Sequence, residues 1–436
     1  MIGHKAWEDE DEMADRQRHA MSAALKSPMP APTVTPPPAP GLPRLQAILM
    51  MAGMVLVGLN LRPALSGVAP LLREIRGQLD LSTAYGGLLT TAPVLCLGLF
   101  GPAAPRLARR FGIETTVFAT VILLAFGTAL RSLGGAPLLF LGAILCGASI
   151  GIIGVLLPGL VKRDFPNRMG LATGAYTMAL CFGAAAAAGL TAPAEHWLAG
   201  LGVPGDWRPA LAIWAVPALV AALVWAPQLA RARRAPAAPA RPPVRGLWRQ
   251  PLAWQVTLFM GLQSSLSYCV FGWLAPILQD RGLTPVQSGF VVSVSALLQV
   301  GSAMVAPMLT GKGPDQRWLA LLTLSLVIVG LMGAVAAPLS TLWLWAVILG
   351  LGQGSTFAVA LMLIVLRSPT PEAAAALSGM AQSVGYTLAA MGPFAVGVIK
   401  DRTGSWDAVQ LLFIGLAAAC MLAGLGAGRN RTVTVG

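Results

Sequence analysis

Long apolar stretches alternate with short polar segments along this chain of 436 residues. Each stretch has the roughly 20 residues that a helix needs to cross the hydrocarbon core of a bilayer. The pattern predicts twelve spans, at about 45–69, 83–104, 113–131, 136–160, 169–192, 208–227, 251–275, 286–309, 318–337, 341–366, 377–399 and 408–427. We therefore expect an all-α polytopic membrane protein.

Two polar segments divide this pattern. The first 43 residues begin with an acidic cluster and end in the run APTVTPPPAPGLP, which cannot bury enough apolar surface to fold. A second segment, rich in arginine, alanine and proline, separates the first six spans from the last six. The predicted organisation is a disordered cytoplasmic tail (1–43), a six-helix bundle (44–227), a cytoplasmic linker (228–250), a second six-helix bundle (251–428) and a cytoplasmic tail (429–436).

The two halves contain similar segments in the same order. GLNLRPALSGVAPLL, which starts at Gly58, matches GLQSSLSYCVFGWLAPIL, which starts at Gly261. TGAYT at Thr173 likewise matches SVGYT at Ser383. Matches in one order are expected of parallel repeats related by an axis along the membrane normal. We therefore predict two six-helix bundles around a central cavity.

The net charge of +13 comes from basic residues in the loops and tails and does not indicate a nucleic-acid-binding patch. Most arginines and lysines lie in the tails and in alternate loops, and no aromatic-interleaved basic patch accompanies them. The positive-inside rule then puts both termini in the cytoplasm. We expect the protein to lie in the inner membrane, with the lipid bilayer as its partner and no nucleic acid. The opposite loops hold only Arg73, Arg76, Arg131, Arg208, Arg281, Lys400 and Arg402.

Cysteine and histidine positions argue against metal, cofactor and enzyme chemistry. The five cysteines fall inside predicted spans at unrelated spacings, which fits apolar packing better than disulfides or ligation. The histidines lie in the first tail or in one loop, at His4, His19 and His196. A membrane enzyme would need a nucleophile, a base or metal ligands at one depth. We therefore expect no catalytic residue, no metal and no cofactor.

Arg62 is the one full charge inside an otherwise uncharged apolar span, in GLNLRPALSG. A guanidinium near the bilayer centre costs roughly 2.5–3.5 kcal/mol on insertion scales, so it needs a partner, a wet cavity or a ligand. Pro63 removes the amide that would bond the carbonyl of Leu59, so we expect the helix to loosen there. No carboxylate lies deep in a predicted span. Two roles stay open: contact with an anionic substrate, or a structural bracket between spans.

Other polar side chains lie on the spans that would line the cavity. Gln382 and Tyr386 are four residues apart and share a helix face. An amide or a phenol can hydrogen-bond a small planar ligand, and tyrosine adds a face for stacking. Each of these groups also fits an interhelical hydrogen bond. The candidate substrate-binding residues are Asn60, Arg62, Tyr176, Gln263, Tyr268, Gln353, Gln382 and Tyr386.

Several blocks of the chain together resemble one family. NLRPALSGVAPLL, LPGLVKRDFPNRMGLATGAYT and LSGMAQSVGYTLAAMGPF are similar to the major facilitator superfamily, in the branch of cyanate transporters and 2-nitroimidazole exporters. The resemblance covers nearly all of Gly53 to Gly428. It implies the major facilitator fold, twelve helices in two six-helix bundles, and alternating access.

One loop departs from the family pattern. GPAAPRLARRFG has Pro105 where the pattern G-x-x-x-D-R-x-G-R-R has its acid, which puts the usual charge relay in doubt. Arg106, Arg109 and Arg110 remain, either as a gating loop that exchanges helix carbonyls for lipid phosphate or as orientation signals alone.

The predicted function is secondary transport by a monomer. The resemblance implies a small, planar, polar or anionic solute, similar to cyanate or a nitroimidazole, with a coupling proton or an exchanged anion as second solute. The alternatives are transport of another organic anion or drug by efflux, and a membrane solute sensor.

Overall fold

The computed structural model describes residues 44–165, 168–203, 205–232, 246–310 and 315–434. The predicted tail 1–43, most of the linker and the last two residues lie outside this part of the chain. The first half contains α2 (Arg44–Leu61), α3 (Pro63–Ser66), η1 (Ala69–Leu71), α4 (Leu72–Gln78), α5 (Thr83–Phe100), η2 (Gly101–Ala103), α6 (Ala104–Phe111), α7 (Ile113–Leu130), α8 (Ala136–Asp164), α9 (Met169–Gly200), α10 (Trp207–Ala212), α11 (Ala215–Trp225), η4 (Ala226–Gln228) and α12 (Leu229–Ala232).

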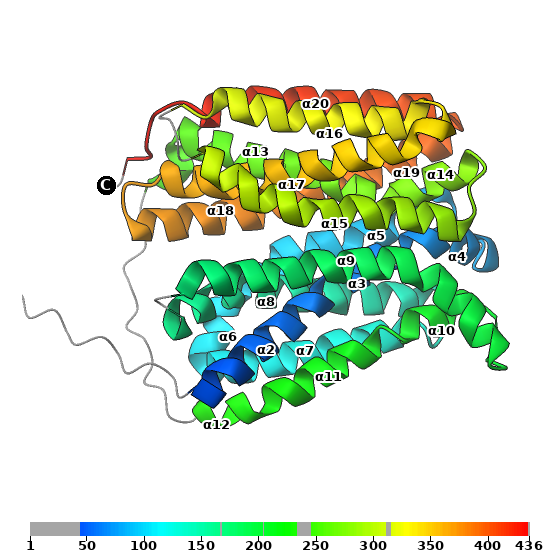
Figure 1. Cartoon of the computed structure of the whole chain (residues 1–436), viewed down its shortest axis with the longest axis horizontal. Coiled ribbons are helices and arrows are strands. Elements are labelled where there is room, and N and C mark those ends of the chain that lie inside the picture. Colours follow the sequence, from blue (N-terminus) through cyan, green and yellow to red (C-terminus); the bar gives the residue numbers. More distant parts are fainter. Residues whose placement is uncertain (1–43, 166–167, 204, 233–245, 311–314, 435–436) are drawn as a thin grey trace, which may run out of the picture. The chain divides into compact units, whose positions relative to one another are not determined.

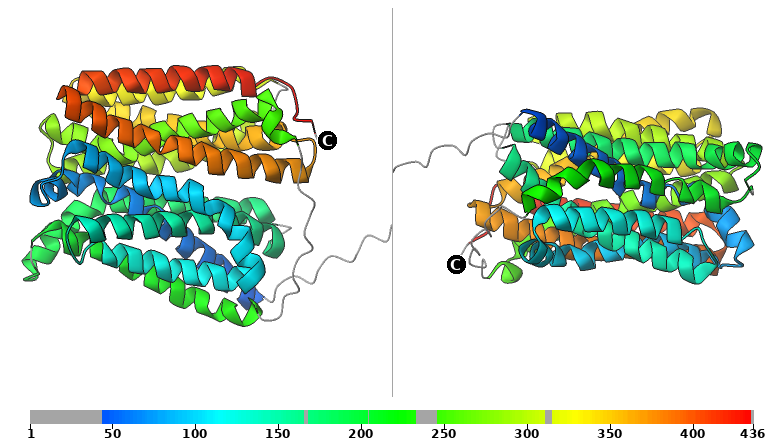
Figure 2. Two further views of the ribbon diagram at one scale, coloured as in Figure 1. Left: turned by 180° about the vertical axis from the view of Figure 1, so that it is seen from behind. Right: turned by 90° about the horizontal axis from the view of Figure 1, so that it is seen from below.

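The second half has the corresponding elements. They are η5 (Leu247–Arg249), α13 (Pro251–Cys269), the π-helical η6 (Val270–Leu274), α14 (Ala275–Asp280), α15 (Pro285–Thr310), α16 (Arg317–Ala336), η7 (Leu339–Thr341), α17 (Leu342–Leu366), α18 (Pro371–Ala389), α19 (Met391–Thr403) and α20 (Trp406–Ala427). Figure 1 and the opposite view in Figure 2 both show the helices of each half grouped together.

Among the described residues, twelve helical segments are long and apolar enough to cross a membrane, which confirms the predicted spans. The ends differ from the prediction because amphipathic turns continue several helices beyond their apolar centres. The first span, predicted to end near residue 69, runs over Leu45–Gln78, and the eleventh runs over Ala373–Thr403. These extensions carry the polar groups that join the two halves.

Helix packing repeats between the halves. In the first half α2 packs on α9 and α11, α5 packs on α8, and α7 packs on α8 and α11. The second half has the equivalent pairs: α13 with α18 and α20, α15 with α17, and α16 with α17 and α20. Between the halves α9 packs on α15, and α5 packs on α18 and α19. This is the arrangement that the predicted parallel repeat requires.

The first span of each half departs from a regular α-helix. α2 ends at Leu61, and α3 begins at Pro63 with Arg62 at its N-cap, as expected of a proline that removes a helical donor. In the second half, residues Val270–Leu274 form a π-helical segment, a feature often found at functional sites. This segment contacts α3 and η1. The two interrupted spans therefore meet between the halves.

Gly183 on α9 lies directly against the break in the first span. A Cβ atom there would come within 1.9 Å of the carbonyl oxygen of Leu59, the group that Pro63 leaves without its helical donor. No side chain fits between these backbones. The backbone of α9 therefore packs directly against the break between α2 and α3.

We expect Gly183→Ala to destabilise the protein by about 1–3 kcal/mol, because an overpacked methyl group must push α9 away from α2. Gly174→Ala on the same helix is the matched control, since its Cβ would meet nothing within 4 Å. Alanine there should be neutral or stabilising, because helical glycine costs about 0.5–1 kcal/mol relative to alanine. Thermal unfolding in detergent measures both. Equal unfolding temperatures would contradict the close contact.

Candidate functional site

Arg62 is half-buried at the break between α2 and α3. Its guanidinium carbon lies 5.3 Å from the ring centroid of Phe271 in the π-helical segment, within cation–π range. Within the described part of the chain, this guanidinium has no acidic partner and no hydrogen bond of its own. Ser66, one turn on, donates to the main-chain oxygens of Arg62 and Ala184. The charge is therefore not neutralised by the described chain.

Three predicted tyrosines gather around this charge. The rings of Tyr268 and Tyr386 pack edge to face with centroids 6.3 Å apart. Tyr268 packs with Leu65 on a buried group that includes Val94, and Tyr176 lies against Gly58, one turn before Arg62. Arg62 directly precedes α3, and the tyrosines come from α9, α13 and α18, so both halves contribute. The structure brings them together as one cluster, which we call the Arg62 cluster.

Small apolar side chains form one wall of the Arg62 cluster. Val94 of α5 packs with Ala389 and Ala390, and Leu65 and Tyr268 lie against this group. An apolar wall lowers the local dielectric constant and strengthens the field of a nearby charge.

The geometry of the cluster suits a small anion with a planar or linear shape. A guanidinium presents five N–H donors in a rigid fork that matches paired oxygen atoms. A phenol can donate to a ligand or accept from it, and its ring offers a surface for stacking. No group of three or more histidine, cysteine or acidic residues in the described ranges could hold a metal ion. The five cysteines are free and buried.

The four predicted amides have partners inside the protein. Asn60 donates to the carbonyl oxygens of Leu56 and of Pro217 on α11, at 2.8 and 3.1 Å. The other three amides bond side chains on their own or a neighbouring helix: Gln263 donates to Ser264, Gln382 donates to Ser378, and Gln353 accepts from Gln299. Asn60 and Gln353 thus link helices. Their contact with a solute stays a prediction.

The three arginines of the predicted gating loop are exposed on and beside α6. Arg106 donates to the carbonyl oxygen of Pro102 at 3.1 Å, and the guanidinium of Arg110 lies 5.2 Å from the Phe111 ring. Arg109 and Arg110 occupy the last turn of α6, where a positive charge is favourable. These contacts stay within one loop, and gating is a prediction.

Two basic residues on the side of the protein where α2 begins clamp helices together. Arg163 pairs with Glu114 at 2.6 Å and with Asp164 at 2.8 Å, which ties α8 to α7. Arg367 is buried and donates to the carbonyl oxygen of Ala427 at 2.8 Å, at the end of α20. Burial lowers the pKa of Arg367 from its ordinary value, but an arginine stays charged at neutral pH. We call this side of the protein the Arg44 end.

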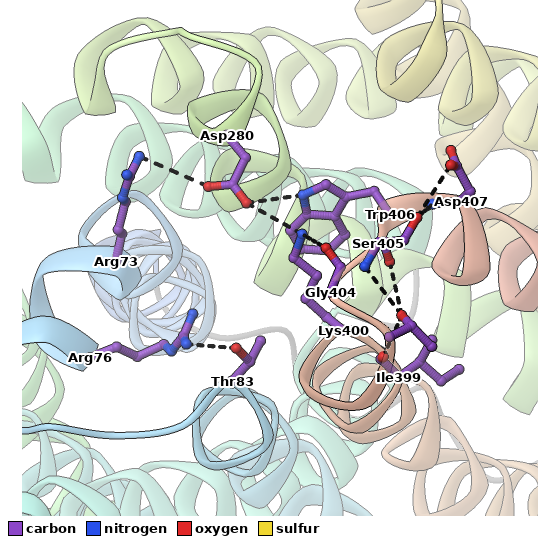
Figure 3. A network of polar contacts seen from close by, with 11 residues as sticks. Arg73, Arg76, Thr83, Asp280, Ile399, Lys400, Gly404, Ser405, Trp406 and Asp407 are labelled. Atoms are coloured by element: carbon purple, nitrogen blue, oxygen red, sulfur yellow. Dashed lines mark hydrogen bonds and ion pairs between the residues drawn. The ribbon is translucent and has the colours of Figure 1, made fainter.

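Polar contacts join the halves on the opposite side, which we call the Asp280 end after the last residue of α14. Asp280 lies 3.9 Å from the guanidinium of Arg73 in the first half and 3.8 Å from the ammonium of Lys400 (Figure 3). Its carboxylate also accepts from the indole of Trp406 at 3.0 Å. The buried amide of Gln279 donates to the carbonyl oxygen of Pro70 at 2.8 Å.

Asp401 of α19 adds a bond to a helix of the other half. Its carboxylate accepts from the amides of Thr83 and Ala84, at 2.8 and 3.0 Å, and so caps the N-terminus of α5. Gly87 and Gly397 allow the two backbones to touch one turn away, since a Cβ on Gly397 would lie 2.9 Å from the Cα of Gly87. The halves are thus closed together at the Asp280 end.

Sequence reasoning missed two residues near the Arg62 cluster. Phe271 carried no signal, because its role depends on the π-helical turn that aims it at Arg62. Arg131 was grouped with exposed loop arginines, but it is 1% exposed. Its Nη1 atom donates to the carbonyl oxygen of Ala64, two residues after Arg62, at 2.8 Å.

Comparison with known proteins gives matches over most of the chain. The sequence profile of the Major Facilitator Superfamily matches residues 48–393. A 2-nitroimidazole transporter of Escherichia coli K12 is 40% identical over 391 residues, which are 88% of this chain and 97% of that protein. The cyanate transport protein CynX of the same strain is 32% identical over 372 residues, or 84% and 95% of the two chains.

A solved structure has a similar fold. It is a bacterial homologue of the human lysosomal transporter Spinster in an inward-facing, unoccupied conformation, with a TM-score of 0.71 and 16% identity. The match covers 91% of this chain and 100% of that one. These findings confirm the predicted fold class and family resemblance. The matched family and relatives are transporters, which also confirms that the chain is not an enzyme.

Proposed function

Because the chain belongs to the major facilitator superfamily, we propose that it is a secondary transporter of a small, planar, polar or anionic solute. The choice of solute rests on one observation: the half-buried Arg62 guanidinium has no counterion in the described chain and lies over the ring of Phe271. Intramembrane charges of this kind are costly, and they usually mark substrate pathways. The solute supplies the negatively charged or electron-rich oxygen atom that accepts hydrogen bonds from Arg62.

The substrate class follows from the chemistry that the relatives share. Cyanate is a small anion, and 2-nitroimidazole is a planar ring with an electron-rich nitro group. Both can accept hydrogen bonds from a guanidinium and lie against a tyrosine ring. Tyr176, Tyr268 and Tyr386 are the residues that we assign to this second contact. Organic anions and drugs of similar shape are the alternative cargo.

We propose alternating access in the inner membrane, with both chain ends in the cytoplasm. The positive-inside rule supports this orientation, because the basic loops lie at the Arg44 end. The Asp280 end then faces outward. Its contacts between the halves support an outward side that is closed in this conformation.

Flux in proteoliposomes tests the proposal. Vesicles that contain the protein should take up labelled cyanate or 2-nitroimidazole faster than empty vesicles, with saturation and with competition by unlabelled solute. An imposed pH gradient and a preloaded anion separate proton cotransport from exchange. Solute that binds but never crosses, for every cyanate-like, nitroaromatic and carboxylate probe, would favour a membrane sensor and reject transport.

A further inference from the structure

Arg131 is a buried cation that has no role in the transport function proposed above. It follows α7 directly and is 1% exposed. Only one of its three side-chain nitrogens has a partner among the described residues: Nη1 donates to Ala64, whereas Nε and Nη2 donate to nothing. A buried charge that is only partly satisfied costs stability. A purely structural role would not explain such an arginine.

The single bond of Arg131 falls on the segment that carries Arg62. Ala64 lies in α3, the four-residue helix after the break, in which the carbonyl oxygen of Pro63 accepts from the amide of Gly67. Arg131 supplies one donor from α7, and Ser66 bonds Ala184 of α9 on another side. The broken turn is thus held between two neighbouring helices.

Close packing between α7 and α8 fixes the position of the Arg131 backbone. α7 and α8 cross at Gly127 and Gly142, and a Cβ on Gly142 would lie 2.4 Å from the Gly127 oxygen and 2.8 Å from the Arg131 amide. The backbone of Arg131 therefore has little freedom, and its side chain reaches Ala64 from a rigid base.

We propose that Arg131 is a positioning residue that holds the turn after Arg62 and so fixes the Arg62 guanidinium against Phe271. The effect on solute affinity rests on the proposed function, whereas the effect on the turn does not. Loss of the bond lets α3 open more often, so that Arg62 meets the solute in several orientations.

Arg131→Met tests this, because methionine fills a similar apolar volume and cannot donate. Hydrogen exchange of the peptide over residues 62–68 in ligand-free protein should accelerate about tenfold, as expected for one lost hydrogen bond to a charged group. The dissociation constant for 2-nitroimidazole or cyanate should rise by a similar factor. The unfolding temperature should stay the same or rise, because an incompletely paired buried charge is removed. Arg131→Lys should restore both the slower exchange and part of the affinity.

Arg281→Met is the matched control. Arg281 lies in the second half and donates to the carbonyl oxygens of Ala334 and Ala337 of the same half, so its loss should leave exchange over residues 62–68 unchanged. Unchanged exchange in Arg131→Met, or a lower unfolding temperature with faster exchange throughout the chain, would overturn the positioning role. If the wild type binds neither probe, the proposed function fails, and the exchange result still decides the role of Arg131.

Discussion

Glutamine in place of Arg62 is expected to lower affinity for an anionic solute by roughly 10- to 150-fold and to stop its transport. The estimate corresponds to loss of one charged hydrogen bond, about 1.5–3 kcal/mol, at 1.4 kcal/mol per tenfold change. Folding should suffer little, because the guanidinium has no acidic and no hydrogen-bond partner in the described chain and loses only its cation–π contact with Phe271. The unfolding temperature without solute should therefore stay level or rise, since glutamine is cheaper to bury than a charge.

Two further variants sharpen this test. Arg62→Lys keeps the charge without the planar fork, so we expect an intermediate affinity. Lys162→Gln removes one positive charge from an exposed site at the Arg44 end and should behave as the wild type. Binding is measured by thermal shift or calorimetry with cyanate and 2-nitroimidazole. Equal affinities in Arg62→Gln and wild type would remove Arg62 from the binding site.

The break at Arg62 could be predicted because its cause is local. Proline lacks an amide wherever it stands, so Pro63 had to leave the Leu59 carbonyl without a helical donor. The π-helical turn around Phe271 has no such local cause, since it depends on how residues Val270–Leu274 pack against α3 and η1. The sequence therefore predicted one side of the Arg62 cluster and missed the residue that faces Arg62 from the other.

The predicted polar residues fall into two groups, those that meet in the Arg62 cluster and those that bond elsewhere, for a similar reason. Tyr268 and Tyr386 were predicted on separate spans, and the packing of α13 on α18 makes their rings meet. Asn60 carries the same kind of signal in the sequence, but its amide bonds Pro217 on α11. Arg131 was assigned to a loop because it stands at the end of its apolar span, and its burial depends on packing against α3 and α8. A polar residue in a span is visible in sequence, whereas its partner is a property of the packing.

Removal of the Asp401 carboxylate is expected to open the Asp280 end. Asp401→Ala deprives the α5 N-terminus of two hydrogen bonds from the other half and of a negative charge favourable to the helix dipole. Loss of a cap costs about 0.5–2 kcal/mol. Because Asp401 can cap α5 only while the halves are closed, the cost falls on this conformation alone. One to two kcal/mol corresponds to roughly 5- to 30-fold in the ratio of closed to open states.

Double electron–electron resonance measures this change. The spin labels replace Leu133 and Leu339 in a variant without other cysteines. Both positions are exposed, and they follow α7 and α16 in different halves at the Asp280 end. Asp401→Ala should add a longer component to the distance distribution. Asp407→Ala is the control, because Asp407 bonds Ser405 and Gln410 within its own half and should leave the distribution unchanged. An identical distribution in wild type and Asp401→Ala would show that the cap does not hold the halves together, and closure would then depend on Gln279 and Asp280.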